Sequence, residues 1–328
     1  MKQRVFVTRK IPDEGLRMIT EKFDTTVWPS EEPPSIQEII QNAEDCEGLV
    51  TLLSDPMGAD VIDKLPNLRV IAQYAVGYDN IDVSRATERK IAVTNTPGVL
   101  TETTADLAWA LIMAASRRVA EADRYVRDKK WNVAWGPEML LGSDVHGATL
   151  GIIGLGRIGS AVARRAVGFN MKILYHTRSE SEFTEEIEKV MKGSRVDLHT
   201  LLKESDIISI HIPLSPETKH LVGETEFNLM KSNAVLVNTS RGPVIDEEAL
   251  FKALESGQIS AAGLDVFTQE PLQQDSPLMN LSNLVLAPHI GSASTKTRAT
   301  MGIMCAENLI AVLNGDRPPN LVNPDVIK

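Results

Sequence analysis

The chain has 328 residues, of which 43% are hydrophobic and 24% are charged, and its formal net charge is −10. This length favours two domains of ordinary size, and the composition is typical of a globular protein in water. The acidic balance argues against a nucleic-acid partner, which would need a basic face. Cys46 and Cys305 are the two cysteines, and neither Cys nor His recurs at metal-ligand spacing, so we expect no disulfide framework and no metal.

The start of the chain and its apolar runs predict a cytoplasmic protein that does not enter the membrane. Residues 1–7 pass directly into a predicted strand and have the wrong length and flanks for a signal peptide. The apolar run from Leu107 to Ser116 is well short of the ~20 residues that a membrane-spanning helix needs.

Residues 4–96 alternate between strand and helix patterns. The expected strands are 4–8, 25–28, 48–53, 68–74 and 91–95, and the expected helices are 13–22, 36–44, 59–64 and 81–89. The strands are near-continuous runs of Val, Ile and Leu, so they predict a parallel sheet with helices on both faces. This stretch has no glycine fingerprint, and we interpret it as a separate α/β domain with another task.

Two helices and a tryptophan-containing loop are expected next. The helix over residues 105–118 is apolar on most sides and should be buried, whereas the helix over 119–128 is charged. Trp131 and Trp135 follow in one loop that ends near Gly142. Such tryptophans either form an interface or pocket wall, or simply anchor the loop.

The stretch 149–159, TLGIIGLGRIG, organises the rest of the chain. It predicts a strand that runs into a G-x-G-x-x-G turn and then into a helix over 160–166, with a second strand at 171–176. Such a unit binds a dinucleotide: Gly154 makes the tight turn, Gly156 lets the backbone approach the pyrophosphate, and Gly159 lets the helix pack on the strand. The helix N-terminus adds N–H donors for the phosphates.

Three ionisable residues follow later predicted strands. The expected strands are 207–212, 234–238, 260–267 and 284–288, and the expected helices are 197–203, 224–230, 247–255 and 295–313. Arg241, Glu270 and His289 come just after the last three strands, at the edge where α/β sheets bind ligands. Individually each could be an ordinary loop residue. Together they supply the cation, carboxylate and imidazole that reduction of a ketone needs, since a proton must reach the oxygen and its charge must be held.

Four ordered motifs, 154–159, 238–242, 263–271 and 288–292, resemble those of the D-isomer-specific 2-hydroxyacid dehydrogenases, and the resemblance covers essentially the whole chain. Residues 75–82, AVGYDNID, resemble the family's substrate-carboxylate loop, and the subgroup most resembled is the glyoxylate/hydroxypyruvate reductases. The resemblance implies two doubly wound parallel-sheet domains. A Rossmann NAD(P)-binding domain (99–290) is inserted into a flavodoxin-like substrate domain (1–98 and 291–328), and homodimers form through Ala105–Trp135.

The resemblance also implies roles for individual residues. Arg241 would bind the substrate carboxylate and carbonyl oxygen, His289 would be the acid/base, and Glu270 would pair with His289. The remaining substrate contacts would come from Val76, Gly77, Trp135 and Ser292. The expected cofactor contacts are Thr104, Gly154, Leu155, Gly156, Arg157, Ile158, Gly159, Thr177, Arg178, Ser179, His211, Pro213, Thr218, Thr239, Ser240, Arg241, Asp265, His289 and Gly291.

The end of the second fingerprint strand favours NADP(H), with NAD(H) as the alternative. An NAD enzyme usually has an acid there for the ribose 2′-OH, but Thr177, Arg178 and Ser179 precede the first carboxylate, Glu180. An arginine suits a 2′-phosphate. Arg178 could instead be an exposed residue that stacks on adenine.

These observations predict an enzyme that transfers a hydride from NAD(P)H to a small 2-ketoacid. Glyoxylate and hydroxypyruvate, which give glycolate and D-glycerate, are the expected substrates. The alternatives are a 2-ketogluconate or other D-2-hydroxyacid dehydrogenase, and a non-catalytic nucleotide-sensing protein of the same fold.

Overall fold

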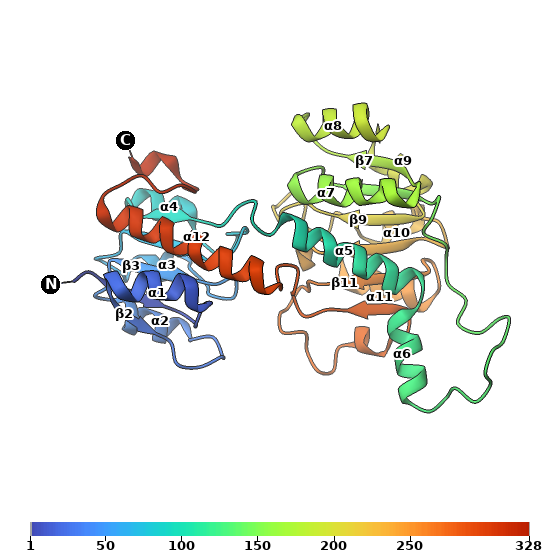
Figure 1. The fold of residues 1–328 in the computed structure, drawn as a ribbon, viewed down its shortest axis with the longest axis horizontal. Helices are drawn as coiled ribbons and strands as arrows, with labels where there is room; N and C mark the ends of the chain where they lie inside the picture. The colour runs from blue at the N-terminus through green and yellow to red at the C-terminus, as the bar shows by residue number, and fades with distance from the viewer. Residues whose placement is uncertain (1, 328) are drawn as a thin grey trace. The chain divides into compact units, whose positions relative to one another are not determined.

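The computed structural model describes residues 2–327, and the chain forms two compact units (Figure 1). Unit 1 comprises Met1–Leu100 and Ser292–Lys328, and unit 2 comprises Thr101–Gly291. The chain therefore leaves unit 1 after residue 100 and returns to it at residue 292. These positions lie two residues and one residue beyond the boundaries expected from the sequence, so Gly291 falls in unit 2.

Unit 1 contains a five-stranded, fully parallel sheet in the order β2-β1-β3-β4-β5. This is the flavodoxin-like order that the family resemblance implied. The strands are β1 (Arg4–Val7), β2 (Asp24–Val27), β3 (Gly48–Thr51), β4 (Val70–Gln73) and β5 (Ala92–Thr94).

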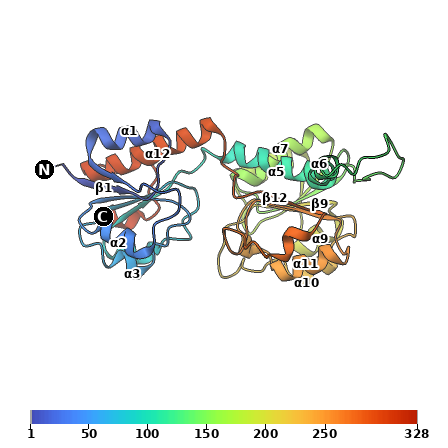
Figure 2. The same cartoon turned by 90° about the horizontal axis from the view of Figure 1, so that it is seen from below.

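Helices cover both faces of this sheet (Figure 2). α1 (Asp13–Lys22) and α12 (Thr295–Asn314) lie on one face, and α2 (Ile36–Ala43), α3 (Ala59–Ile62) and α4 (Val83–Glu88) contribute to the other. α1 and α12 approach closely at Gly15, because a side chain there would overlap the backbone of Gly302. The last long helix thus completes a core that the first hundred residues begin.

Unit 2 contains a seven-stranded parallel sheet in the order β12-β11-β10-β9-β6-β7-β8. The strands are β6 (Thr149–Ile153), β7 (Lys172–His176), β8 (Ser194–Arg195), β9 (Ile207–Ile210), β10 (Val235–Asn238), β11 (Ala261–Leu264) and β12 (Leu284–Leu286). This is the Rossmann order, in which the chain reverses direction across the sheet between β6 and β9.

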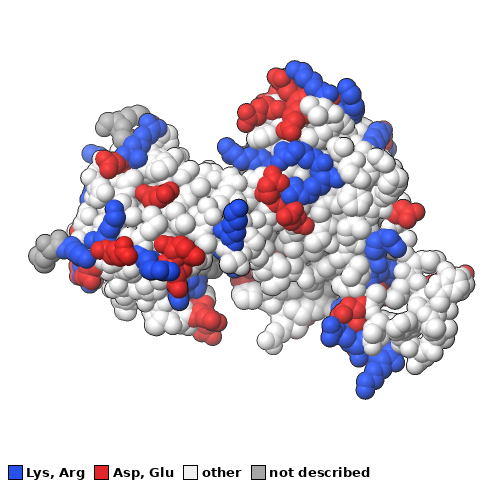
Figure 3. Space-filling model, in the orientation of Figure 1, with Lys and Arg blue, Asp and Glu red and all other residues white. Residues whose placement is uncertain are grey.

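The helices of unit 2 form two layers around this sheet (Figure 2). α5 (Thr101–Ser116), α7 (Arg157–Ala166) and α8 (Glu182–Met191) cover one face, and α9 (Leu198–Glu204), α10 (Glu224–Leu229) and α11 (Glu247–Glu255) cover the other. α6 (Val119–Arg127) extends from α5 and buries none of its residues. Charged side chains of both signs are mixed over α5, α7 and α8 (Figure 3), where Arg165 pairs with Glu102 and Asp106.

Two details differ from the sequence predictions. α5 begins at Thr101, four residues before the expected start at Ala105, because the polar residues 101–104 form its first turn. β8 has two residues and was not predicted, since a strand this short has no hydrophobic periodicity. No helix within residues 2–327 is long and apolar enough to cross a membrane.

Candidate active site

Three loops at the carboxyl ends of adjacent strands of unit 2 carry the ionisable residues singled out in the sequence. β10, β11 and β12 are neighbours in the sheet, so Arg241, Glu270 and His289 emerge at one edge of it. Gly242 brings two of these loops together, because a Cβ at this position would overlap the backbone of Phe267. Only glycine permits this close approach. Gly242 directly follows Arg241, and Phe267 lies three residues before Glu270, so the contact sets the spacing of the two loops.

His289 and Glu270 form a direct pair. Nδ1 of His289 lies 2.6 Å from Oε2 of Glu270, and about a third of each side chain is exposed. The other carboxylate oxygen, Oε1, accepts a hydrogen bond from the N–H of Phe267 at 3.0 Å. The carboxylate is therefore fixed at both oxygens, and it fixes the imidazole in turn.

The environment of Glu270 keeps its carboxylate ionised. Burial by itself would raise the pKa of Glu270, but the hydrogen bond and charge of His289, the Phe267 N–H and the charge of Arg241 together lower it. An ionised carboxylate can only accept hydrogen bonds. Nδ1 of His289 is then the donor, which leaves Nε2 for a substrate.

Asp265 shapes the backbone that presents His289. Its Oδ1 accepts a hydrogen bond from the N–H of Ile290 at 2.7 Å, and its Oδ2 accepts one from Gly291 at 2.8 Å. His289 itself has a left-handed backbone, with φ of 52°, and its N–H bonds to the carbonyl of Asp265. Burial raises the pKa of Asp265, although the two N–H groups and the charge of His289 oppose the shift. The expected contact of Asp265 with the nicotinamide remains a prediction.

The neighbouring residues of this edge are also ordered by hydrogen bonds. Asn238 donates from Nδ2 to the carbonyl of Arg241 at 2.9 Å and accepts from the hydroxyl of Ser240 at 2.7 Å. The buried hydroxyl of Thr104, in α5, donates to the carbonyl of Gly291 at 3.2 Å. Hydrogen bonds thus order the loop after β10 and link the loop after β12 to the first turn of α5.

The glycine fingerprint has the geometry that a dinucleotide needs. Gly154 has φ of 95°, and a Cβ there would press on the carbonyl of His211. A Cβ on Gly159 would overlap the carbonyl oxygen of Gly154, whereas a Cβ on Gly156 would meet nothing within 4 Å. Gly154 and Gly159 are therefore required by the fold, while Gly156 leaves open space at the start of α7, where a pyrophosphate would bind. Arg157 and Ile158 form the first turn of α7, and Leu155 is buried.

Other predicted cofactor residues line the same edge of the sheet. The hydroxyl of Thr239 is buried and has no hydrogen-bond partner within residues 2–327, so it is available to bond to a cofactor. The hydroxyl of Thr218 donates to the carbonyl of Pro213 at 2.7 Å and holds that loop. Burial lowers the pKa of His211 to about 3, so its imidazole is neutral at pH 7. These features fit a nicotinamide dinucleotide.

The loop after β7 contains Arg178, which is predicted to bind the 2′-phosphate of the cofactor. The structure shows that Arg195, which the sequence analysis did not single out, also bonds to this loop. Thr177 is partly exposed, and Arg178 and Ser179 are exposed. Nη2 of Arg195, in β8, donates to the carbonyls of Thr177 at 2.9 Å and Arg178 at 3.3 Å. Only the pairing of β7 with β8 brings Arg195 to this loop, and the sequence carried no signal for that pairing.

The expected substrate-binding residues are divided between the units. Val76, Gly77 and Ser292 belong to unit 1, whereas Arg241, His289 and Trp135 belong to unit 2. The side chain of Trp135 is 77% exposed, and Trp131 and Val133 beside it are also exposed. Trp135 therefore does not anchor the loop in its own chain.

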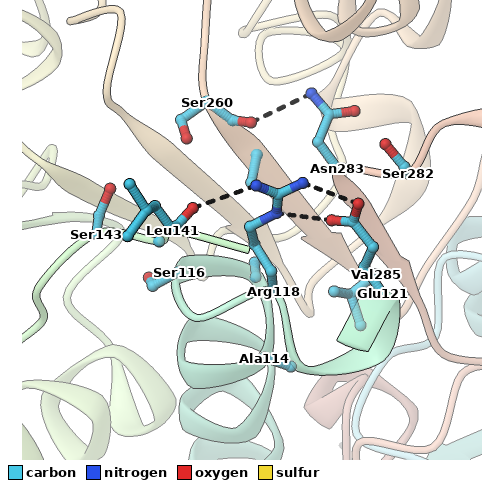
Figure 4. A pocket seen from close by; sticks show the side chains of 13 residues that line it. Ala114, Ser116, Arg118, Glu121, Leu141, Ser143, Ser260, Ser282, Asn283 and Val285 are labelled. Atoms are coloured by element: carbon cyan, nitrogen blue, oxygen red, sulfur yellow. Dashed lines mark hydrogen bonds and ion pairs between the residues drawn. The ribbon is translucent and has the colours of Figure 1, made fainter. Parts of the chain in front are cut away.

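A cavity of about 330 Å³ in unit 2 lies away from these residues (Figure 4). Ser260 and Asn283, which precede β11 and β12, line it, so it opens at the amino ends of the strands. Arg118 extends across the cavity, and its guanidinium donates two hydrogen bonds to the carboxylate of Glu121, from Nε to Oε2 and from Nη2 to Oε1. The candidate active site is at the opposite edge of the sheet.

Comparison with known proteins identifies the family. Residues 109–291, more than half of the chain, match the family model described as the NAD binding domain of the D-isomer specific 2-hydroxyacid dehydrogenases. The chain belongs to this family. It is an NAD(P)-dependent dehydrogenase, an oxidoreductase that acts on 2-ketoacids.

Several members of the family are similar over their whole length. A glyoxylate reductase of Korarchaeum cryptofilum is 59% identical over 328 residues, which cover 100% of this chain and 98% of the relative. A glyoxylate reductase of Thermococcus litoralis is 50% identical over 330 residues, with the same coverage. Among solved structures, an NADPH-dependent glyoxylate/hydroxypyruvate reductase of Sinorhizobium meliloti, in complex with NADP and malonate, has a TM-score of 0.86 and 32% identity, and the match covers 98% of this chain and 97% of that one.

Proposed function

We propose that this protein is an NADPH-preferring reductase of glyoxylate and hydroxypyruvate, with His289, Glu270 and Arg241 as its reacting machinery. The observation that carries the proposal is the 2.6 Å pair between His289 and Glu270 beside Arg241, on the ligand-binding edge of a Rossmann sheet. The names of the similar glyoxylate reductases support the choice of substrate. Unit 2 then binds the cofactor, and unit 1 contributes the substrate loop.

The nicotinamide, when bound, supplies a hydride to the carbonyl carbon of the ketoacid. His289 delivers the proton from Nε2 to the carbonyl oxygen, so that the ketone becomes a hydroxyl group. The Arg241 guanidinium holds the substrate carboxylate and the carbonyl oxygen, where negative charge develops. Ionised Glu270 stabilises the charged imidazole and fixes its orientation.

The test is oxidation of NADPH in the presence of a panel of 2-ketoacids. Glyoxylate and hydroxypyruvate should give the highest kcat/KM. Pyruvate should be slower but still accepted: relative to glyoxylate it has an extra methyl group, which changes specificity by only ~1–3 kcal/mol, and relative to hydroxypyruvate it lacks the hydroxyl group. Preference for 2-ketogluconate or a large aromatic ketoacid would change the substrate assignment. Cofactor binding without turnover of any ketoacid would indicate a nucleotide sensor.

We propose that Arg178 selects NADPH by pairing with its 2′-phosphate. Charge-assisted hydrogen bonds contribute ~1.5–3 kcal/mol, so kcat/KM should favour NADPH over NADH by roughly tenfold to a hundredfold. Arg178→Ala should remove most of this preference and leave NADH kinetics near the parental values. Equal use of both cofactors by the parent would contradict the assignment.

We also propose that the protein is a homodimer through the segment Ala105–Trp135, in which the exposed Trp135 acts as an interface residue that reaches a substrate pocket. Exposed apolar residues along this segment, including Val119, Val126 and Trp131, support this proposal because a lone chain would leave them in water. Light scattering at several concentrations tests it, and a monomer at all of them would contradict it.

A further inference from the structure

Three consecutive backbone carbonyls of the loop after β4 accept hydrogen bonds from within unit 1. The carbonyl of Ala75 accepts from the N–H of Thr96 at 2.8 Å. The carbonyl of Val76 accepts from Nδ2 of Asn95 at 2.8 Å, and that of Gly77 accepts from Nε2 of Gln73 at 3.2 Å. Two of the three donors are side-chain amides, whose position depends on the rest of the fold.

Both donor residues are anchored elsewhere in unit 1, Gln73 through its side chain and Asn95 through its backbone. Gln73 is fully buried, its Oε1 accepts from the hydroxyl of Thr51 at 2.6 Å, and its Nε2 also donates to Asn80 at 2.8 Å. The backbone carbonyl of Asn95 accepts from Nδ2 of Asn308, a buried residue of α12, at 3.0 Å. Each donor is therefore anchored to another part of the core before it reaches the loop.

Fixing these carbonyls also fixes the direction of the next N–H groups. A trans peptide group is planar, and its N–H points away from its C=O. The bond from Thr96 to the carbonyl of Ala75 thus sets the direction of the Val76 N–H. In the same way, the bond from Asn95 to Val76 sets the direction of the Gly77 N–H, and the bond from Gln73 to Gly77 sets that of the Tyr78 N–H. Within the described part of unit 1, none of these three N–H groups has a hydrogen-bond acceptor, and Val76 and Gly77 are partly exposed.

We propose that Asn95 and Gln73 are positioning residues that turn the N–H groups of Gly77 and Tyr78, beside that of Val76, into a nest for the substrate carboxylate. Successive backbone N–H groups that point to one side bind anions. The inference rests on the proposed function and adds to it a third donor, the N–H of Tyr78, and the two side chains that aim the loop. Neither side chain needs to touch the substrate.

The test replaces each amide by an apolar side chain of similar size, Asn95→Leu and Gln73→Met, in the full-length protein. Asn95→Leu frees the carbonyl of Val76, and Gln73→Met frees that of Gly77 and also removes the bonds to Thr51 and Asn80. In both variants the KM for glyoxylate and the inhibition constant of oxamate, a carboxylate that cannot be reduced, should rise about tenfold. The kcat and the KM for NADPH should change much less, because the acid/base pair and the cofactor site belong to unit 2. Asn95→Ala repeats the test with no added bulk if Asn95→Leu does not fold.

Asn323→Leu is the matched control. Asn323 is also a buried amide of unit 1, but it bonds to Val93, Ile91 and Thr87 and not to the loop. It should lower the melting temperature and leave the KM for glyoxylate unchanged. If Asn95→Leu and Gln73→Met behave like this control, the positioning role is wrong. If the parent itself reduces no ketoacid, the proposed function fails instead.

Discussion

At the scale of single residues, the Glu270–His289 pair should make reduction depend on pH. The lowered pKa of Glu270 keeps its carboxylate ionised to below the usual range of a glutamate, so the charge that supports proton delivery from His289 should be lost only under acidic conditions, and kcat on glyoxylate should fall there. Glu270→Gln removes this charge at every pH, so its kcat should be lower and should lack this acidic fall, as a pH–rate profile would reveal.

His289→Ala should remove the proton donor altogether. It should reduce kcat by roughly 10²–10⁴-fold, the usual contribution of a general acid, while the melting temperature and the KM for NADPH stay near the parental values. A variant that kept near-parental kcat would show that another group delivers the proton.

At the scale of elements, the turn from β6 into α7 separates glycines needed for folding from a glycine needed for binding. Gly159→Ala places a methyl group against the carbonyl of Gly154 and should destabilise the protein measurably. Gly156→Ala meets open space, so its free energy of unfolding should change by less than ~0.5 kcal/mol. Its KM for NADPH should nevertheless rise at least about tenfold, since the methyl group would obstruct the pyrophosphate.

Thermal melts and NADPH titrations of both variants distinguish these effects. Parental NADPH affinity in Gly156→Ala would mean that the cofactor does not approach this turn.

The same elements illustrate how far the sequence could predict the structure. The alternating β and α patterns predicted parallel sheets, and the family resemblance implied their flavodoxin-like and Rossmann arrangements. The strand ends placed Arg241, Glu270 and His289 at one edge because parallel strands share that edge. The sequence did not reveal the left-handed backbone of His289 or the bonds of Asp265 that support it. Arg195 and Asn95 were also missed, because their partners lie 18 and 19 residues away and become neighbours only after the sheets have formed. Gln73 was missed although its loop partner Gly77 is four residues away, because no sequence pattern marks a side-chain bond to a loop carbonyl.

At the scale of the whole molecule, the two units should differ in their ability to fold alone. Unit 2 is one continuous stretch that contains every strand and helix of its two cores. In unit 1, one face of the sheet is covered partly by Leu309 and Leu313 of α12, a helix that follows unit 2 in the sequence. A fragment of residues 101–291 should unfold cooperatively and bind NADPH, whereas a fragment of residues 1–100 should expose apolar surface and bind a hydrophobic dye. A well-folded 1–100 fragment that binds no dye would show that α12 is dispensable.

This interrupted connectivity has a consequence for biosynthesis. A ribosome delivers residues 1–100 first, but the helix that seals their sheet is translated after nearly two hundred intervening residues. During that interval, the nascent first segment must keep an unsealed apolar face away from other chains, while the inserted unit can complete its own core. Unit 1 is therefore the first part of the polypeptide to be made and the last to complete its fold. A chain that stalls before α12 would consist of a folded unit 2 attached to an incomplete unit 1, which proteases that remove unfolded chains could attack.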